Sequence, residues 1–139
     1  MEQVTDLLPH REPFLFVDKI ISQEENKIIT ERKIKADEFF FKGHYPGNPI
    51  MPGVLLCEAM YQSGALLMAK LVSKDGIKGT PVVTRSNNIK YKRMVKPGDL
   101  LCIEVEFIEK MGPAYSFKGL IRVEGKVVVS GEFICAIVA

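Results

Sequence analysis

The stretch that decides the fold is GVLLCEAMYQSGALLMA, residues 53–69, which follows directly on Pro52. Its apolar residues point in every direction around a helix instead of forming one stripe, which is typical of a helix buried on all sides. Proline favours the first position of a helix, because its missing N–H would be unpaired there in any case. The sequence therefore predicts a long buried helix from residue 52 to about residue 72, followed by a loop over residues 73–80.

The same stretch does not fit a membrane span. At about 1.5 Å per residue it is short for the hydrocarbon thickness, and the carboxylate of Glu58 would be costly in lipid. The N-terminal residues MEQVTDLLPHREPF are charged and broken by prolines, so they lack the apolar run of a signal peptide. We expect a soluble, cytoplasmic protein without a membrane partner.

Composition indicates one domain over residues 1–139. Hydrophobic residues make up 47% of the 139 residues and charged residues 26%, which supplies a core and argues against disorder. No repeat, low-complexity tract or linker marks a domain boundary. With 19 Lys and Arg against 17 Asp and Glu, the net charge of +2 does not indicate a general nucleic-acid binder.

The sequence predicts neither a disulfide nor a metal site. Cys57, Cys102 and Cys135 are far apart, odd in number and flanked by apolar residues, which favours buried reduced thiols. With only two histidines and no clustered cysteines, the chain lacks the ligand spacing of a zinc or iron site. It also lacks phosphate-loop and nucleotide-binding motifs.

Six strand-like segments accompany the helix, and together they predict the α+β class. A helical turn over residues 2–8 is closed by Pro9, and Glu124-Gly125 fits a two-residue hairpin turn. A helix that is apolar all round needs a sheet that curls around it, so we expect the helix against one face of an antiparallel sheet. The predicted strands cover residues 14–21, 27–34, 81–93, 99–110, 114–123 and 126–138.

The two histidines are candidates for acid–base chemistry. His44 lies in GHYPGNPIMPG, residues 43–53, an ordered loop rich in glycine and proline just before the helix. A histidine pinned in such a loop can act as a general base near neutral pH, and an ordinary hydrogen-bonded loop histidine is the alternative. His10, in Leu-Pro-His-Arg, is expected to be structural or solvated.

Glu58 is the unusual residue of the helix. A carboxylate among apolar neighbours must be paired or protonated, and Gln62, four residues on, can hydrogen-bond it. Burial would raise the pKa of Glu58 and let it donate a proton, whereas a satisfied structural carboxylate or an exposed helix face is the alternative. Spacing alone does not bring His44 and Glu58 together.

Two further features can contact a ligand or a partner. The Gly53 N–H, in the first helical turn, lacks a helical partner and can polarise a carbonyl as an oxyanion-hole donor. Four basic residues fall in one seven-residue stretch, either as a solvated strand edge or as a docking surface for an acidic partner. They are Lys90, Lys92, Arg93 and Lys96.

A family resemblance is carried by three blocks in order: LLPHREPFLFVD at 7–18, GHYPGNPIMPGVLLCEAMYQSGALL at 43–67, and YKRMVKPGD at 91–99. From about residue 7 to residue 136 the chain resembles the 3-hydroxyacyl-acyl-carrier-protein dehydratases of the FabZ type. The resemblance implies the hot-dog fold, in which a curved antiparallel sheet wraps one long helix. That fold agrees with the α+β class read from the pattern.

The resemblance also implies a reaction, the reversible loss of water from a 3-hydroxyacyl thioester to give the trans-2-enoyl thioester in type II fatty acid biosynthesis. His44 matches the family's catalytic histidine, which removes the C2 proton. Glu58 matches its catalytic glutamate, which assists departure of the 3-hydroxyl directly or through a water. Gly53 matches the glycine whose N–H contacts the thioester carbonyl. A version in which His44 serves both ends of the reaction stays open.

The partners implied by the resemblance are a second copy of the chain and a carrier protein. Family members form homodimers in which one chain supplies the histidine and its partner the glutamate, usually assembled further as a trimer of dimers. The substrate arrives on the phosphopantetheine of an acidic acyl carrier protein, which gives the basic stretch a role. No cofactor is implied, because the thioester itself supplies the acidity at C2.

Three positions depart from the family pattern. Tyr45 replaces a common phenylalanine, Met94 a frequent proline, and Tyr61 a frequent small alanine. If Tyr61 faces the acyl tunnel, it shortens or reshapes the tunnel and changes the range of chain lengths. The alternatives are a hot-dog dehydratase of another acyl-chain pathway, an acyl thioesterase, and a non-catalytic acyl-thioester-binding module.

Overall fold

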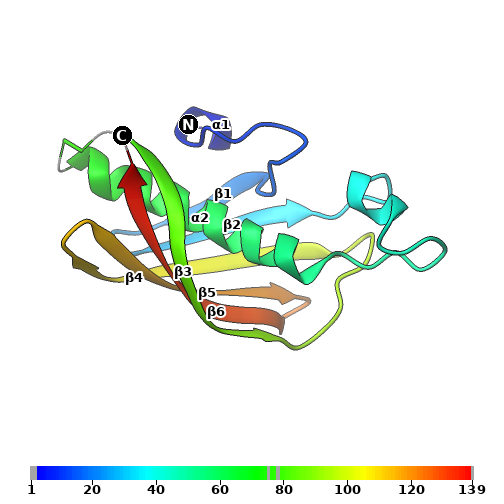
Figure 1. Ribbon diagram of the computed structural model, residues 1–139. Coiled ribbons are helices and arrows are strands. Elements are labelled where there is room, and N and C mark those ends of the chain that lie inside the picture. Colours follow the sequence, from blue (N-terminus) through cyan, green and yellow to red (C-terminus); the bar gives the residue numbers. More distant parts are fainter. Residues whose placement is uncertain (1–2, 75, 78, 139) are drawn as a thin grey trace.

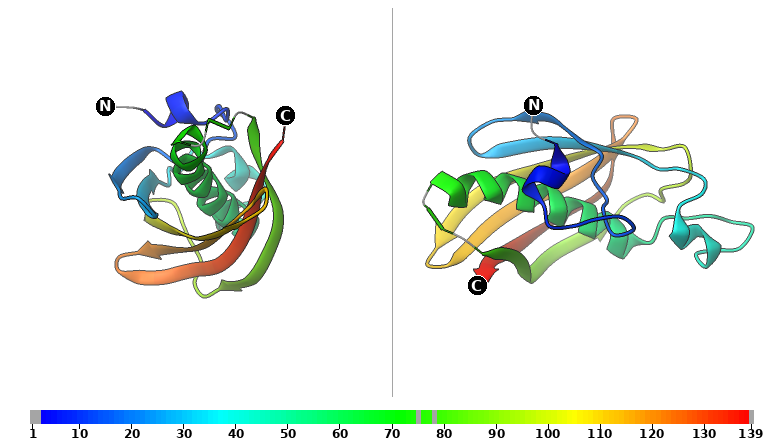
Figure 2. Two further views of the ribbon diagram at one scale, coloured as in Figure 1. Left: turned by 90° about the vertical axis from the view of Figure 1, so that its left-hand side faces the viewer. Right: turned by 90° about the horizontal axis from the view of Figure 1, so that it is seen from above.

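The computed structural model describes residues 3–74, 76–77 and 79–138 and has the predicted α+β architecture. Helix α2 (Gly53–Lys74) lies across one face of a six-stranded antiparallel sheet that curls around it (Figures 1 and 2). The strand order is β1-β2-β4-β5-β6-β3. The remaining elements are α1 (Val4–Leu7), β1 (Lys19–Gln23), β2 (Lys27–Lys33), a 3-10 helix (Phe39–Lys42), β3 (Thr80–Tyr91), β4 (Leu100–Met111), β5 (Ala114–Val123) and β6 (Lys126–Val138).

Helix α2 is buried along most of its length, as its all-round apolar pattern predicts. The sheet covers one side and the N-terminal segment with α1 crosses the other (Figure 2). Leu56, Met60 and Leu67 are each no more than 2% exposed. They form one core with the inward residues of the sheet, such as Leu101 and Ile103 of β4. Among the described residues, no helix is long and apolar enough to cross a membrane.

Strand alternation corrects one expectation about the cysteines. Leu101 and Ile103 of β4 face the core, so Cys102 between them points outward and is exposed. The expectation that all three thiols are buried is therefore wrong for Cys102 and confirmed for Cys57 and Cys135. Apolar neighbours along a strand do not bury a residue whose own side chain lies on the other face.

The predicted bounds hold best where two strands meet in a hairpin. Strands β5 and β6 begin and end at the predicted residues. Glu124 and Gly125 both have positive φ, 51° and 78°, which the twist of a tight two-residue hairpin requires. The loop predicted over residues 73–80 contains Asp75 and Lys78, which lie outside the described residues.

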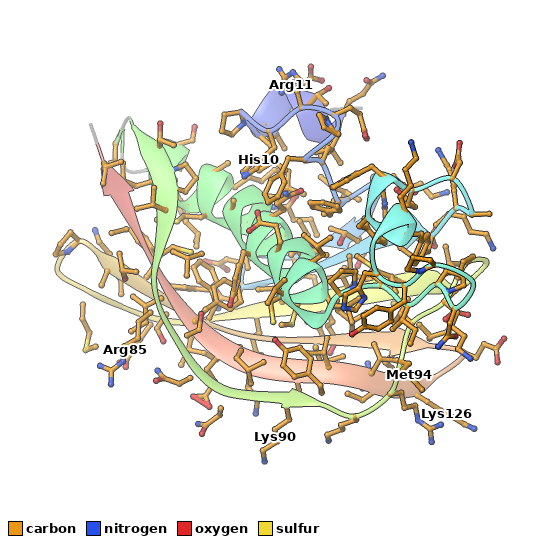
Figure 3. All side chains as sticks on the ribbon, turned by 45° about the vertical axis from the view of Figure 1, so that its right-hand side comes forward. His10, Arg11, Arg85, Lys90, Met94 and Lys126 are labelled. Carbon is orange, nitrogen blue, oxygen red and sulfur yellow. The ribbon has the colours of Figure 1, made fainter. Side chains whose placement is uncertain are left out.

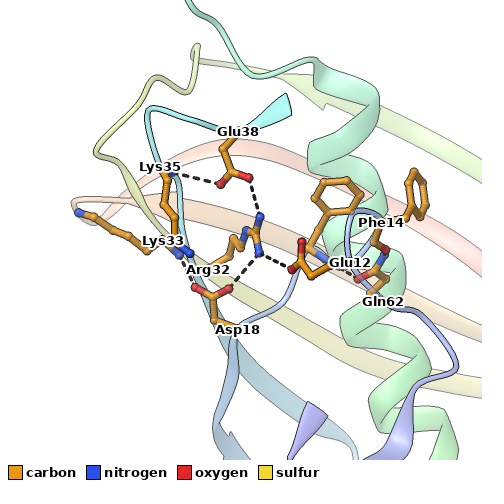
Figure 4. Close-up of polar contacts among 9 residues, drawn as sticks. Glu12, Phe14, Asp18, Arg32, Lys33, Lys35, Glu38 and Gln62 are labelled. Carbon is orange, nitrogen blue, oxygen red and sulfur yellow. Dashed lines mark hydrogen bonds and ion pairs between the residues drawn. The ribbon is translucent and has the colours of Figure 1, made fainter. Parts of the chain in front are cut away.

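The first predicted strand is wrong over residues 14–18, because β1 begins only at Lys19. Phe14 and Phe16 instead bond to the side chain of Gln62 on α2 (Figure 4). The Phe16 N–H donates to Gln62 Oε1 at 2.8 Å, and Gln62 Nε2 donates to the Phe14 carbonyl at 3.0 Å. The buried amide of Gln62 thus satisfies two backbone groups that a neighbouring strand would otherwise satisfy. Residues 14–16 therefore pack on the helix.

A buried guanidinium fixes the start of the loop that carries His44. The Arg32 side chain on β2 is 7% exposed and contacts Asp18 at 3.1 Å and Glu38 at 2.8 Å (Figure 4). The ring of Phe16 lies 5.8 Å from the guanidinium carbon. Because a buried charge must be paired, this cluster holds the N-terminal segment, β2 and the approach to the 3-10 helix in one arrangement.

Within the described part of the chain, strand β3 is one edge of the sheet and pairs with β6 alone. Its pairing register shifts at two places, and Val82 and Val83 remain 37% and 38% exposed. A long edge strand offers unpaired backbone groups to another strand, and apolar side chains here make the edge suitable for a second chain.

Candidate active site

Glu58 lies where α2, the N-terminal segment and β3 meet. Its side chain is 22% exposed, and one carboxylate oxygen accepts a hydrogen bond from Gln62 Nε2 at 3.0 Å. The carboxylate lines a pocket of about 410 Å³. The other lining residues are His10, Phe14, Tyr61, Ala65, Pro81, Val82, Val83 and Cys135.

Burial raises the pKa of Glu58 above 4.5, because removal from water disfavours the charged carboxylate. The hydrogen bond from Gln62 and the positive charge that His10 carries when protonated both lower this pKa, but their effects are smaller. The raised pKa expected from the sequence is confirmed. A protonated Glu58 can donate a proton to a group bound in the pocket.

The His44 ring is held in a defined orientation by its own loop. Its Nδ1 lies 2.8 Å from the Ile50 carbonyl oxygen, and the Ile50 N–H donates back to the His44 carbonyl. A carbonyl only accepts, so Nδ1 carries the ring proton and Nε2 keeps a free lone pair. The Tyr45 ring stacks on the imidazole with centroids 4.1 Å apart. This arrangement leaves Nε2 able to accept a proton.

The structure does not bring His44 and Glu58 together within one chain. Among the described residues, no hydrogen bond or ion pair joins them, and the pocket at Glu58 does not include His44. The loop that carries His44 extends beyond the N-terminal end of α2 (Figure 1). Within one described chain the two groups are therefore not in direct contact.

Gly53 is the first residue of α2, one position after the predicted start. The N–H groups of Leu55 and Leu56 both donate to the Pro52 carbonyl, while no hydrogen bond within the described chain uses the Gly53 N–H. A Cβ at Gly53 would lie 2.6 Å from Cε1 of Tyr91. The glycine therefore permits the close approach of an aromatic ring and leaves its N–H free to donate.

A second apolar pocket continues from the one at Glu58. It measures about 340 Å³ and shares Ala65 and Pro81 with the first. Along α2 the lining residues recur on one helical face, from Glu58 and Tyr61 through Ala65 to Met68, Ala69 and Val72. Tyr61 stands early on this path: its OH bonds to Ser86 Oγ at 2.7 Å and its ring packs edge-on against Phe133.

His10 is a residue of this site that the sequence reasoning missed. It is 24% exposed, and its Nε2 lies 3.7 Å from Glu58 Oε2. The sequence carried only a weak signal, an imidazole in an otherwise apolar segment. Its proximity to Glu58 depends on the contacts between Gln62 and the N-terminal segment.

The four basic residues are exposed at the end of β3 and in the loop after it. The Lys92 and Arg93 N–H groups donate to the Val128 carbonyl, and the Met51 N–H donates to the Val95 carbonyl at 2.8 Å. The first two bonds hold the basic stretch against β6, and the third joins it to the loop that carries His44. Figure 3 shows Lys90 pointing away from the sheet. No group of three or more potential metal ligands occurs among the residues described.

Comparisons with known proteins match nearly the whole chain. Residues 8–136 match the FabA-like domain. The chain is 43% identical over 139 residues to the 3-hydroxyacyl-[acyl-carrier-protein] dehydratase FabZ of Caldicellulosiruptor bescii, covering 99% of this chain and 97% of that protein. It is 46% identical over 136 residues to the FabZ dehydratase of Caldicellulosiruptor saccharolyticus, covering 96% and 95%.

Among solved structures, the dehydratase heterocomplex ApeI:P from Xenorhabdus doucetiae matches with a TM-score of 0.86 at 18% identity, covering 100% of this chain and 93% of that one. At this identity the likeness concerns the fold alone. The hot-dog arrangement of one long helix in a curved six-stranded sheet is confirmed.

The raised pKa of Glu58 makes a prediction about stability. A carboxyl whose pKa is raised by folding stabilises the fold fully below pH 4.5 and loses that contribution as pH rises through the folded-state pKa. Glu58→Gln should therefore gain stability relative to wild type as pH rises from below 4.5 to neutral, measured by urea unfolding at each pH. Glu25→Gln, on an exposed side chain that forms no ion pair or hydrogen bond among the described residues, is the control and should differ little from wild type throughout. A pH-independent difference for Glu58→Gln would contradict the assignment.

Proposed function

The chain belongs to the FabA-like family, and from this we infer that it is a 3-hydroxyacyl-acyl carrier protein dehydratase of the FabZ type. It removes water reversibly from the 3-hydroxyacyl thioester to give the trans-2-enoyl thioester in fatty acid biosynthesis. Identity to FabZ dehydratases across nearly the whole chain is the observation that carries this conclusion. The partly buried carboxyl of Glu58, which lines the first of two connected apolar pockets, supports this conclusion.

We propose that His44 is the general base. Its Nδ1–H is engaged by the Ile50 carbonyl, so Nε2 is free to take the proton from C2 of the acyl group. The free N–H of Gly53 would donate to the thioester oxygen as negative charge develops there, with the partial positive charge of the helix N-terminus in support. The electron pair left at C2 then forms the C2–C3 double bond.

Glu58 is proposed as the acid for the leaving group. Burial raises the pKa of its carboxyl, which favours the protonated form that can donate to the 3-hydroxyl. When the C3–O bond breaks, that proton leaves with the oxygen as water. Gln62 is a positioning residue, because its amide orients the Glu58 carboxylate and is itself fixed by Phe14 and Phe16.

We propose that two chains share each active site. His44 and Glu58 lie apart in one chain, and the exposed edge of β3 with Val82 and Val83 is suited to pairing with a second copy. The partner would then supply the histidine that faces Glu58. By the family resemblance, three such dimers would assemble into a hexamer.

The acyl chain is proposed to lie along the two connected pockets beside α2. From Glu58 the path passes Tyr61 and Ala65 and continues to Val72 between apolar side chains. The hydrogen bond between Ser86 and the Tyr61 OH holds the Tyr61 ring in place beside Glu58, where the ring occupies part of the first pocket. Carrier-protein docking is proposed for the exposed basic residues beside the loop of His44, which would attract an acidic partner.

Hydration of a crotonyl thioester tests the catalytic residues. His44→Ala and Glu58→Gln should each lower kcat by about a hundredfold or more, because each removes one proton-transfer group. Mixing the two inactive variants should restore about a quarter of the wild-type rate, since random exchange makes mixed dimers that each keep one complete site. No recovery in confirmed mixed dimers would exclude a shared site. Acyl release without hydration would instead favour a thioesterase.

Chain-length preference tests Tyr61. Tyr61→Ala should raise kcat/KM for ten-carbon relative to four-carbon substrates by roughly tenfold, because it widens the path past Glu58. Tyr61→Phe keeps the ring and loses only the bond to Ser86, so it should leave the preference near that of wild type. An unchanged preference in Tyr61→Ala would remove Tyr61 from the acyl path.

Charge reversal tests the docking surface. The double variant Lys92→Glu and Arg93→Glu should raise KM for an acyl-carrier-protein substrate about tenfold and leave KM for a short free thioester unchanged. Lys110→Glu, at the far end of β4, is the matched control and should affect neither. The rise should shrink at high salt. Equal effects on both substrates would refute docking at this surface.

A further inference from the structure

His10 lines the pocket at Glu58, and one of its ring nitrogens lacks a hydrogen-bond partner among the described residues. Its Nδ1 is buried and has no hydrogen-bond partner among the described residues, while its Nε2 points toward Glu58. A proton on Nδ1 would be buried without an acceptor, so the ring favours carrying its proton on Nε2. His10 therefore presents an N–H donor to the pocket that Glu58 lines.

The distance between the two groups suits a third atom between them. Nε2 of His10 and Oε2 of Glu58 are 3.7 Å apart, which is too long for a direct hydrogen bond. A single oxygen can lie about 2.8 Å from both at once, a normal hydrogen-bond length to each. Both side chains line the same pocket, so such an oxygen would belong to a bound molecule or a water.

The position of His10 is fixed from two directions. The Arg11 guanidinium donates to the carbonyls of Leu8 and His10, each at 2.7 Å, and braces the backbone locally. Farther along the segment, Phe14 is tied to α2 through Gln62. Figure 3 shows His10 between the N-terminal segment and α2. The imidazole is thus positioned by the same amide that orients Glu58.

We propose that His10 binds the 3-hydroxyl of the substrate together with Glu58, so that the leaving oxygen is held between Nε2 of one and the carboxyl of the other. This inference rests on the proposed role of Glu58 in the dehydration. As the C3–O bond breaks, Glu58 transfers its proton to the departing oxygen, and the His10 N–H donates a hydrogen bond to it without giving up its proton. The C2 proton goes to His44, and the product water leaves between His10 and Glu58.

Binding of paired ligands to an inactive dimer separates this role from a structural one. In the His44→Ala background, the dissociation constants of 3-hydroxyoctanoyl pantetheine and octanoyl pantetheine are measured by calorimetry with and without His10→Phe. Loss of one hydrogen bond should weaken the hydroxylated ligand about three- to tenfold. The ligand without the hydroxyl should bind unchanged, which also shows that the variant is folded.

A second variant and the Glu58 control complete the test. His10→Gln keeps an N–H donor on a flexible chain and should recover part of the preference for the hydroxyl. If His10→Phe weakens both ligands equally, or neither, the proposal is overturned. If Glu58→Leu lowers the preference and His10→Phe does not, the dehydratase mechanism stands and the role of His10 falls. If Glu58→Leu also leaves the preference unchanged, the proposed contact of Glu58 with the hydroxyl fails.

Discussion

The buried amide of Gln62 is the interaction on which the site depends. A helix covered on all sides must satisfy every polar group it carries, and Gln62, 1% exposed, does so with three partners. Its two bonds to Phe14 and Phe16 draw the N-terminal segment across α2, and its third orients Glu58. That segment brings His10 to the pocket. The same side chain serves stability and chemistry, because the bonds of Gln62 satisfy buried polar groups in the core and also position Glu58.

The sheet, in contrast to the helix, leaves the pocket at Glu58 beside an unpaired edge. Strand β3 supplies Pro81, Val82 and Val83 to the pocket at Glu58 and is also an unpaired edge. A surface that is both the wall of a binding pocket and an exposed apolar edge is suited to being covered by a second chain, which the proposed shared site requires. His44 lies in the loop before α2 and is not among the residues that line this pocket, so the wall formed by β3 borders Glu58 and not His44.

The local pattern of apolar and turn residues predicted most of the fold. The features that it did not predict depend on contacts between residues far apart in the sequence. The buried helix and the β5–β6 hairpin depend on features within each segment, an all-round apolar face and a turn with two positive φ angles. Residues 14–18 look like a strand, yet the Phe16 N–H and the Phe14 carbonyl bond to the side chain of Gln62, 46 and 48 positions away. The family resemblance drew attention to His44 and Glu58, whereas the place of His10 beside Glu58 follows from the same distant amide and left no local signal.

The pKa of Glu58 shows how the fold reconciles two opposing demands. Desolvation favours the protonated acid that a leaving hydroxyl needs, while the hydrogen bond from Gln62 favours the carboxylate that remains after proton transfer. Because desolvation is the larger effect, the pKa of Glu58 lies above its ordinary value, and the carboxylate left after proton transfer still has a donor to stabilise it. Replacing Gln62 by an apolar residue would strengthen the first effect and remove the second. An amide at this position therefore serves both directions of a reversible reaction, in which Glu58 must give up its proton and take it back.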